Sequence, residues 1–255
     1  MDLDLSSVLL QWAAGGLLGL WVTGRHHMLG VGYGWLLRAS FAVLAMGGIA
    51  AGIAADDHGV GATIRNVGGF VMVAVVMVAL FNSVVRRSEP ARIPPVLDLV
   101  AAIAGFVALL GAAAVLGGPF ALSAARLVVG AVFLGFVTDA MLLGHWYLVQ
   151  PGLTREPLKE LVRVAAIAWP IEVALLLVPI GMVSVLNGSI DDGYAGLLGV
   201  TWIVSALTTI VLLGVAWKAL EEPYYSAVMA ATGLLYLAIL TAFGTDVLAR
   251  ALLAA

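Results

Sequence analysis

Long apolar stretches fill most of the chain, and short clusters of charged residues, proline and glycine separate them. A helix needs about 20 largely apolar residues to cross the hydrocarbon core of a bilayer, because lipid offers no hydrogen-bond partner to exposed backbone amides. By this criterion the pattern predicts about eight spanning helices. They are expected at Ser7–Thr23, Trp35–Ala55, Gly68–Val85, Val96–Leu116, Ala121–Val149, Leu161–Leu186, Leu197–Leu220 and Ala227–Leu253. The expected fold is therefore an all-α, polytopic transmembrane helix bundle.

The composition favours a membrane protein over a soluble one. Of the 255 residues, 63% are hydrophobic and 11% are charged, whereas a soluble domain has about 45–50% apolar and about 25% charged residues. This balance excludes a soluble enzyme and a disordered tail. The net charge of −3 gives no basic surface for nucleic acid. The lipid bilayer is the expected partner, and other membrane subunits of a complex are a further candidate.

The basic residues predict the orientation of the helices, because short cytoplasmic loops of membrane proteins carry an excess of Lys and Arg. With the N-terminus outside, nine of the 12 basic residues fall on the cytoplasmic side. The opposite orientation inverts this ratio. We therefore expect a multi-pass protein of a bacterial cytoplasmic (inner) membrane, with both termini on the outer side.

The chain divides into two halves of four predicted helices each, residues 1–118 and residues 119–255, and the second half contains a polar cytoplasmic interfacial segment at 150–162. The loop motif ADDHG after the second helix is similar to IDDG after the sixth, and RRSEP after the third is similar to ALEEP after the seventh. These matches indicate an internal repeat. With four helices each, both halves would have the same orientation in the membrane. The alternative is that alternating loops reuse common turn residues.

Four histidines and no cysteine limit how the chain can hold a cofactor. Three of them, His26, His27 and His145, fall at the cytoplasmic interface on two different helices. Imidazole ligates haem iron and other transition metals, so His145 with His27, or with His26, is a candidate ligand pair for a haem b. Trp146 and Tyr147 would then give an aromatic wall for the haem or for a quinone ring. The alternative is that these rings anchor the helices at the membrane interface.

Two carboxylic acids lie within predicted spanning helices, where ionisable groups are energetically costly and commonly functional. Asp139 and Glu172 each lie about nine residues from the cytoplasmic end of their helix, or roughly 14 Å at helical rise. Because the two helices are consecutive and antiparallel, we expect the carboxyl groups near the midplane, close enough to share a proton. They are candidates for a proton or cation relay, and the alternative is two neutral acids with local hydrogen bonds. Asp246 and Arg250 are expected to form an ion pair on a helix surface near the interface.

These features leave three functions open. The favoured hypothesis is a redox or respiratory-accessory membrane subunit that binds haem b or a quinone near the cytoplasmic leaflet. The alternative is a proton- or cation-coupled transporter of a small solute that uses the two intramembrane acids. The third is a structural or assembly subunit without a site of its own. The sequence contains no nucleotide-binding or hydrolase motif that would point to another class.

Overall fold

The computed structural model describes residues 4–87, 94–116, 118–177, 181–191 and 193–254. This part of the chain forms helices joined by short loops and contains no strand. The helices are α1 (Leu5–Gly24), α2 (Val31–Ala54), α3 (Val60–Val85), α4 (Val96–Val115), α5 (Phe120–Trp146), α6 (Glu156–Leu177), α7 (Met182–Leu186), α8 (Leu197–Glu221) and α9 (Tyr225–Ala254).

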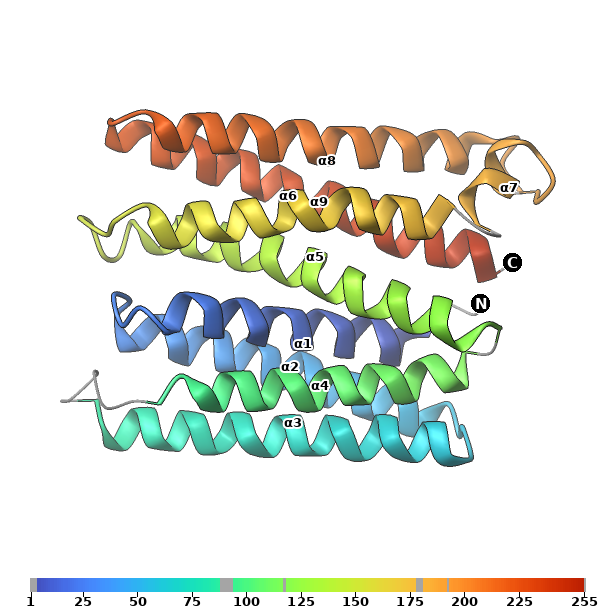
Figure 1. The fold of residues 1–255 in the computed structure, drawn as a ribbon, viewed down its shortest axis with the longest axis horizontal. Helices are drawn as coiled ribbons and strands as arrows, with labels where there is room; N and C mark the ends of the chain where they lie inside the picture. Colours follow the sequence, from blue (N-terminus) through green and yellow to red (C-terminus); the bar gives the residue numbers. More distant parts are fainter. Residues whose placement is uncertain (1–3, 88–93, 117, 178–180, 192, 255) are drawn as a thin grey trace.

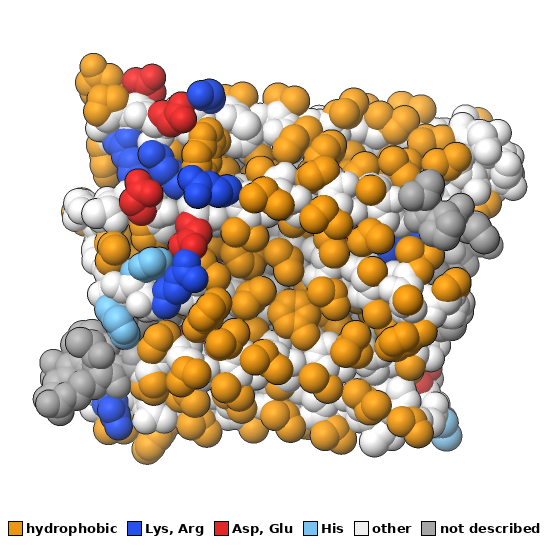
Figure 2. Space-filling model, in the orientation of Figure 1, with side chains coloured by type: hydrophobic (Ala, Val, Ile, Leu, Met, Phe, Trp, Pro, Cys, Tyr) orange, Lys and Arg blue, Asp and Glu red, His pale blue; other side chains and the backbone are white. Residues whose placement is uncertain are grey.

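The long helices run side by side, and the short α7 lies across one end of the bundle (Figure 1). Helix α1 begins and α9 ends at that same end, which we call the terminal end. The opposite end, where α6 begins, we call the polar end. Figure 2 shows why: on the face drawn, charged and histidine side chains gather at this end, while apolar side chains cover the middle. Large exposed apolar residues such as Val43, Phe81 and Leu240 lie on the sides of the bundle and suit contact with lipid.

Among the described residues, seven helices are long and apolar enough to cross a membrane. The expected polytopic helical bundle is therefore confirmed. Helix α6 is not among the seven because it carries too many charged residues, at Glu156, Lys159, Glu160, Arg163 and Glu172. It nevertheless has 22 residues, about 33 Å at helical rise, and runs alongside the other long helices (Figure 1).

Three predicted boundaries were wrong. Helix α3 begins at Val60 rather than at Gly68, because the bundle accommodates the charge of Arg65: its guanidinium donates to Asp57 at 2.7 Å and to the carbonyl of Gly52 at 2.7 Å. The predicted helix 161–186 ends at Leu177, and Met182–Leu186 forms the separate α7. Part of the predicted interfacial segment 150–162 belongs to α6, which begins at Glu156.

The long helices pack as two groups of four. Helix α1 packs against α2 and α4, and α2 and α4 each pack against α3; in the second group α5 packs against α6 and α9, and α6 and α9 each pack against α8. The two groups meet mainly where α1 lies along α5. This arrangement is the one that an internal repeat would give, although the division into two halves at residue 118 stays a prediction.

Small residues bring α1 and α5 into backbone contact. A Cβ atom added to Gly15 of α1 would lie 2.5 Å from the carbonyl carbon of Ala131, and one added to Gly135 of α5 would lie 2.6 Å from Cα of Gly15. Together with Gly19, these residues form a pair of small-xxx-small motifs, which let membrane helices approach closely. The crossing is therefore tightly closed near the middle of the bundle.

Candidate functional site

The predicted haem ligands have different neighbours in the structure. His145 is exposed and its ring lies edge-on to Tyr236 of α9, with ring centroids 6.3 Å apart. His26 lies beside Glu160 of α6, 3.4 Å from a carboxylate oxygen. His27 lines a pocket between α1, α2 and α4. Within the described residues, no group of three or more His, Asp or Glu side chains is placed to hold a metal ion.

Trp146 and Tyr147 have contacts that fasten loops at the polar end. The Trp146 ring packs against Tyr33 of α2 at 5.8 Å between centroids, and its indole nitrogen donates to Gln150 at 3.2 Å. The phenol of Tyr147 donates to the carbonyl oxygen of Thr154. Burial raises the pKa of this phenol above its usual value, so it keeps its proton and remains a donor. Both residues therefore tie the end of α5 to neighbouring segments.

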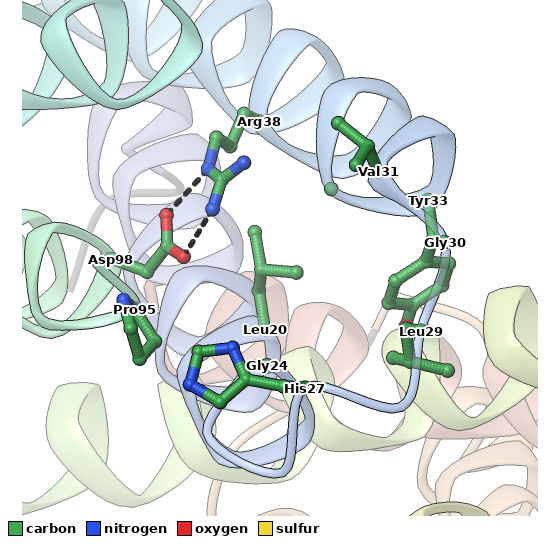
Figure 3. Close-up of a pocket in the computed structure, with 11 residues that line it drawn as sticks. Leu20, Gly24, His27, Leu29, Gly30, Val31, Tyr33, Arg38, Pro95 and Asp98 are labelled. Carbon is green, nitrogen blue, oxygen red and sulfur yellow. Dashed lines mark hydrogen bonds and ion pairs between the residues drawn. The ribbon is translucent and has the colours of Figure 1, made fainter. Parts of the chain in front are cut away.

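A pocket of about 70 Å³ opens at the polar end between α1, α2 and α4 (Figure 3). We call it the Arg38 pocket, and its polar side chains are His27, Tyr33, Arg38 and Asp98. Arg38 donates two hydrogen bonds to Asp98, of 2.7 Å from Nε and 2.6 Å from Nη2. Both side chains are almost fully buried, so α2 and α4 are joined by a bidentate ion pair out of water.

Asp139, on α5, interacts electrostatically with two residues of this pocket. Its carboxyl group is fully buried, and neither oxygen has a hydrogen-bond partner. Gly19 of α1 faces it, so closely that a Cβ atom there would lie 3.1 Å from Cγ of Asp139. The phenol of Tyr33, which lines the pocket, interacts electrostatically with Asp139 and lies near Thr23. Tyr33 and Asp98 are thus the pocket residues that act electrostatically on this carboxyl group.

Glu172 belongs to a different buried cluster, nearer the terminal end. Asp246 of α9 accepts hydrogen bonds from Gln11 of α1 and from Arg250, both of 2.9 Å. Glu172 of α6 interacts electrostatically with Asp246, Arg250 and Arg126 of α5. We call these five side chains the Arg250 cluster. All are buried, Gln11, Glu172 and Asp246 completely so.

The position of Asp246 and Arg250 corrects the expectation of a surface pair. Their side chains are 0% and 5% exposed, because α9 turns them toward α1, α5 and α6 rather than toward the outside. The spacing of four residues predicted the pair itself, and Arg250 Nε does lie 2.9 Å from Asp246 Oδ1. It did not predict which way the pair faces.

Asp139 and Glu172 do not share a proton site in this structure. Glu172 lies beside Arg126, whereas Asp139 is about 13 residues further along α5, roughly 20 Å of helix. The tight crossing of Gly15 with Ala131 lies between them along α1 and α5. The expectation that the two carboxyl groups meet near the midplane is therefore wrong; one lies on each side of the crossing.

Sequence reasoning missed Arg38, Asp98, Gln11 and Arg126 as parts of these sites. Each is a charged or amide side chain in or at the edge of an apolar run, which is itself an indication of a buried partner. Comparison with protein-family models, with curated proteins and with solved structures finds no match to this chain.

Proposed function

We propose that this chain is a proton-coupled membrane transporter of a small solute, with Asp139 and Glu172 as its proton-carrying groups. One observation carries the proposal: both carboxyl groups are fully buried, and neither accepts a hydrogen bond from an N–H or hydroxyl donor. The carboxyl group of Glu172 lies within hydrogen-bonding reach of the carboxyl group of Asp246, a contact that requires a proton on one of the two. Leaving such a group ionised and unpaired costs several kcal/mol in an apolar medium. A carboxyl group that gains and loses a proton avoids this cost while it is protonated. When it is ionised, its charge can attract or repel the groups around it.

The neighbourhood of Asp139 suits proton exchange with the polar end. The Arg38 pocket reaches Tyr33, whose phenol lies within hydrogen-bonding reach of the hydroxyl of Thr23. A hydroxyl both donates and accepts, so Tyr33 and Thr23 can pass a proton between water in the pocket and the carboxyl group. Arg38 is already neutralised by Asp98 and therefore does not hold Asp139 permanently ionised.

The neighbourhood of Glu172 suits exchange from the terminal end. Two guanidinium groups, those of Arg126 and Arg250, act on Glu172, and the carboxylate of Asp246 opposes them. With Glu172 ionised, the two positive and two negative charges of the cluster cancel, so the proton can leave without creating an isolated charge. The helix that carries Glu172 also contains Pro170, which removes one backbone hydrogen bond from α6.

The crossing of α1 and α5 is the barrier between the two carboxyl groups. Backbone contact at Gly15, Ala131 and Gly135 leaves no room for water there. In carriers built from two bundles, access alternates when one bundle rocks against the other. We infer that the groups α1–α4 and α5–α9 rock about this crossing, so that the buried sites open alternately to the two sides of the membrane.

The sidedness follows from the charges at the polar end, which include Arg25, Arg155, Lys159, Arg163 and Lys218. The excess of basic residues favours the cytoplasmic side for this end, in a bacterial inner membrane. Haem b and quinone are not favoured, because His145, His26 and His27 contact different helices. The contacts described for Trp146 and Tyr147 likewise support an anchoring role rather than a cofactor wall.

Modification by dicyclohexylcarbodiimide tests whether the buried carboxyl groups exchange protons. This apolar reagent adds to protonated carboxyl groups in membranes, and peptide mass spectrometry locates the adduct. We expect adducts on Asp139 and Glu172, fewer as the pH is raised, and none at the replaced position in Asp139→Asn or Glu172→Gln. The exposed Glu156 is the internal control and is expected to stay unlabelled. Absence of adducts on both buried residues at every pH would contradict the proposal.

A further inference from the structure

The Arg250 cluster contains unpaired polar atoms of both kinds. Oε1 of Gln11 is a buried acceptor without a donor, and Nη2 of Arg250 is a buried donor without an acceptor. The carboxyl group of Glu172 has no N–H or hydroxyl donor and lies within hydrogen-bonding reach of the carboxyl group of Asp246. Buried polar atoms are normally hydrogen-bonded, and several unpaired ones in one place call for water or a bound ion. Four helices, α1, α5, α6 and α9, supply these side chains, so the cluster lies where the two helix groups meet.

The backbone of α5 lies close against these atoms. A Cβ atom at Gly130 would lie 2.6 Å from Nε2 of Gln11, 3.1 Å from Oδ1 of Asp246 and 3.2 Å from Nη2 of Arg250. Any other residue at this position would push a side chain among the polar groups. Glycine therefore lets the amide, the carboxylate and the guanidinium meet one another against the backbone of α5.

The formal charges of the cluster decide which ion fits. Arg126 and Arg250 contribute two positive charges, and Asp246 and Glu172 contribute two negative charges when both are ionised. These four are the charged groups that act on Glu172 or belong to its cluster, among the residues that the structure describes. A proton on Glu172 leaves the cluster with one positive charge. An isolated charge is unfavourable in a buried site, and a monovalent anion removes it.

Protonation of Glu172 also makes the hydrogen bonding of the cluster more favourable for an anion. An ionised Glu172 only accepts hydrogen bonds and repels an anion, whereas a protonated one presents an O–H donor. That donor and Nη2 of Arg250 can then both point at an anion. We infer that the Arg250 cluster binds one small monovalent anion together with one proton, which Glu172 carries. This inference rests on the proposed function and narrows it: the transported solute is a small anion, and the anion and the proton move in the same direction.

Tryptophan fluorescence of the purified full-length protein in detergent tests this inference directly. Trp202 donates to the carbonyl oxygen of Thr245, the residue before Asp246, at 2.9 Å, and so lies next to the cluster. The probes are chloride, nitrate and formate, titrated as sodium salts at constant ionic strength with gluconate as the bulky anion. We expect saturable binding of at least one probe, and an apparent Kd that falls about tenfold for each unit decrease of pH, because one proton is linked to one anion.

Two variants separate the anion site from the proton. Glu172→Gln imitates the protonated acid without changing its size, and it is expected to bind the anion with a Kd that no longer depends on pH. Arg250→Gln is expected to lose saturable binding. Arg163→Gln removes an exposed guanidinium at the other end of the bundle, where it stacks on Trp217, and should bind like the wild type.

Binding that is absent, or that is independent of pH in the wild type, would overturn the inference. So would pH-dependent binding that persists unchanged in Glu172→Gln. Carbodiimide adducts on Asp139 and Glu172 in the same preparation would then support the proposed function, and only the anion site would be rejected. If the adducts are missing as well, both the proposed function and the anion site are contradicted.

Discussion

Replacing Gly15 with alanine is expected to destabilise the protein strongly. The added Cβ would overlap the backbone of Ala131, lying 2.5 Å from its carbonyl carbon. A backbone atom cannot rotate away as a side chain can, so α1 and α5 must separate. We expect a loss of about 3 kcal/mol or more, at or above the upper end of ordinary overpacking. Thermal unfolding in detergent, followed by size-exclusion chromatography, measures it.

Gly214 provides the matched control. It lies in α8, and a Cβ atom there would meet nothing within 4 Å. Gly214→Ala should therefore leave the unfolding temperature unchanged or raise it slightly, since alanine favours a helix by up to about 1 kcal/mol over glycine. Equal behaviour of Gly15→Ala and Gly214→Ala would show that α1 and α5 do not cross as described.

The second large effect is expected from Arg38. Arg38→Met leaves the carboxylate of Asp98 buried without its two donors. Removing one partner of a buried ion pair costs about 3–5 kcal/mol. The double variant Arg38→Met with Asp98→Leu should recover most of this loss, because an apolar pair of similar size leaves no buried charge. Chemical unfolding measures the loss of stability in the single variant and its recovery in the double variant.

An exposed ion pair at the same end of the bundle is the control for Arg38. Arg25 and Glu160 are paired, but their side chains are 39% and 31% exposed. Glu160→Gln should cost no more than about 1 kcal/mol. A double variant at Arg38 and Asp98 that is no more stable than the single variant would refute the assignment of the loss to an unpaired buried charge.

Hydropathy was sufficient to predict the membrane-spanning bundle, because burial in lipid demands long apolar runs. It failed at α3, where Arg65 looked like a loop residue: a guanidinium paired with Asp57 and Gly52 can lie inside a helix. It also extended the sixth helix past Leu177. That error mattered for function, because Glu172 lies near the end of α6 and not near the middle of a longer helix.

The rotation of each helix could not be predicted from the pattern. His145 and Trp146 are neighbours in the chain, yet one faces Tyr236 and the other faces Tyr33. Topology alone grouped the histidines at one end, which is why they resembled a ligand set. The acids were recognised by their residue type and their apolar surroundings, which do not depend on rotation. Their partners, such as Gln11 and Arg126, required the packing of four helices.

Proton flux into vesicles tests the central claim most directly. The protein is reconstituted with a pH-sensitive dye inside, and a pH gradient is applied in media that offer small anions, small cations or neutral solutes in parallel. We predict that the wild type takes up protons faster than protein-free vesicles in at least one medium, that Asp139→Asn and Glu172→Gln each reduce uptake to the protein-free rate, and that Glu156→Gln does not. Uptake by both variants at the wild-type rate, or no uptake by the wild type in any medium, would contradict the claim.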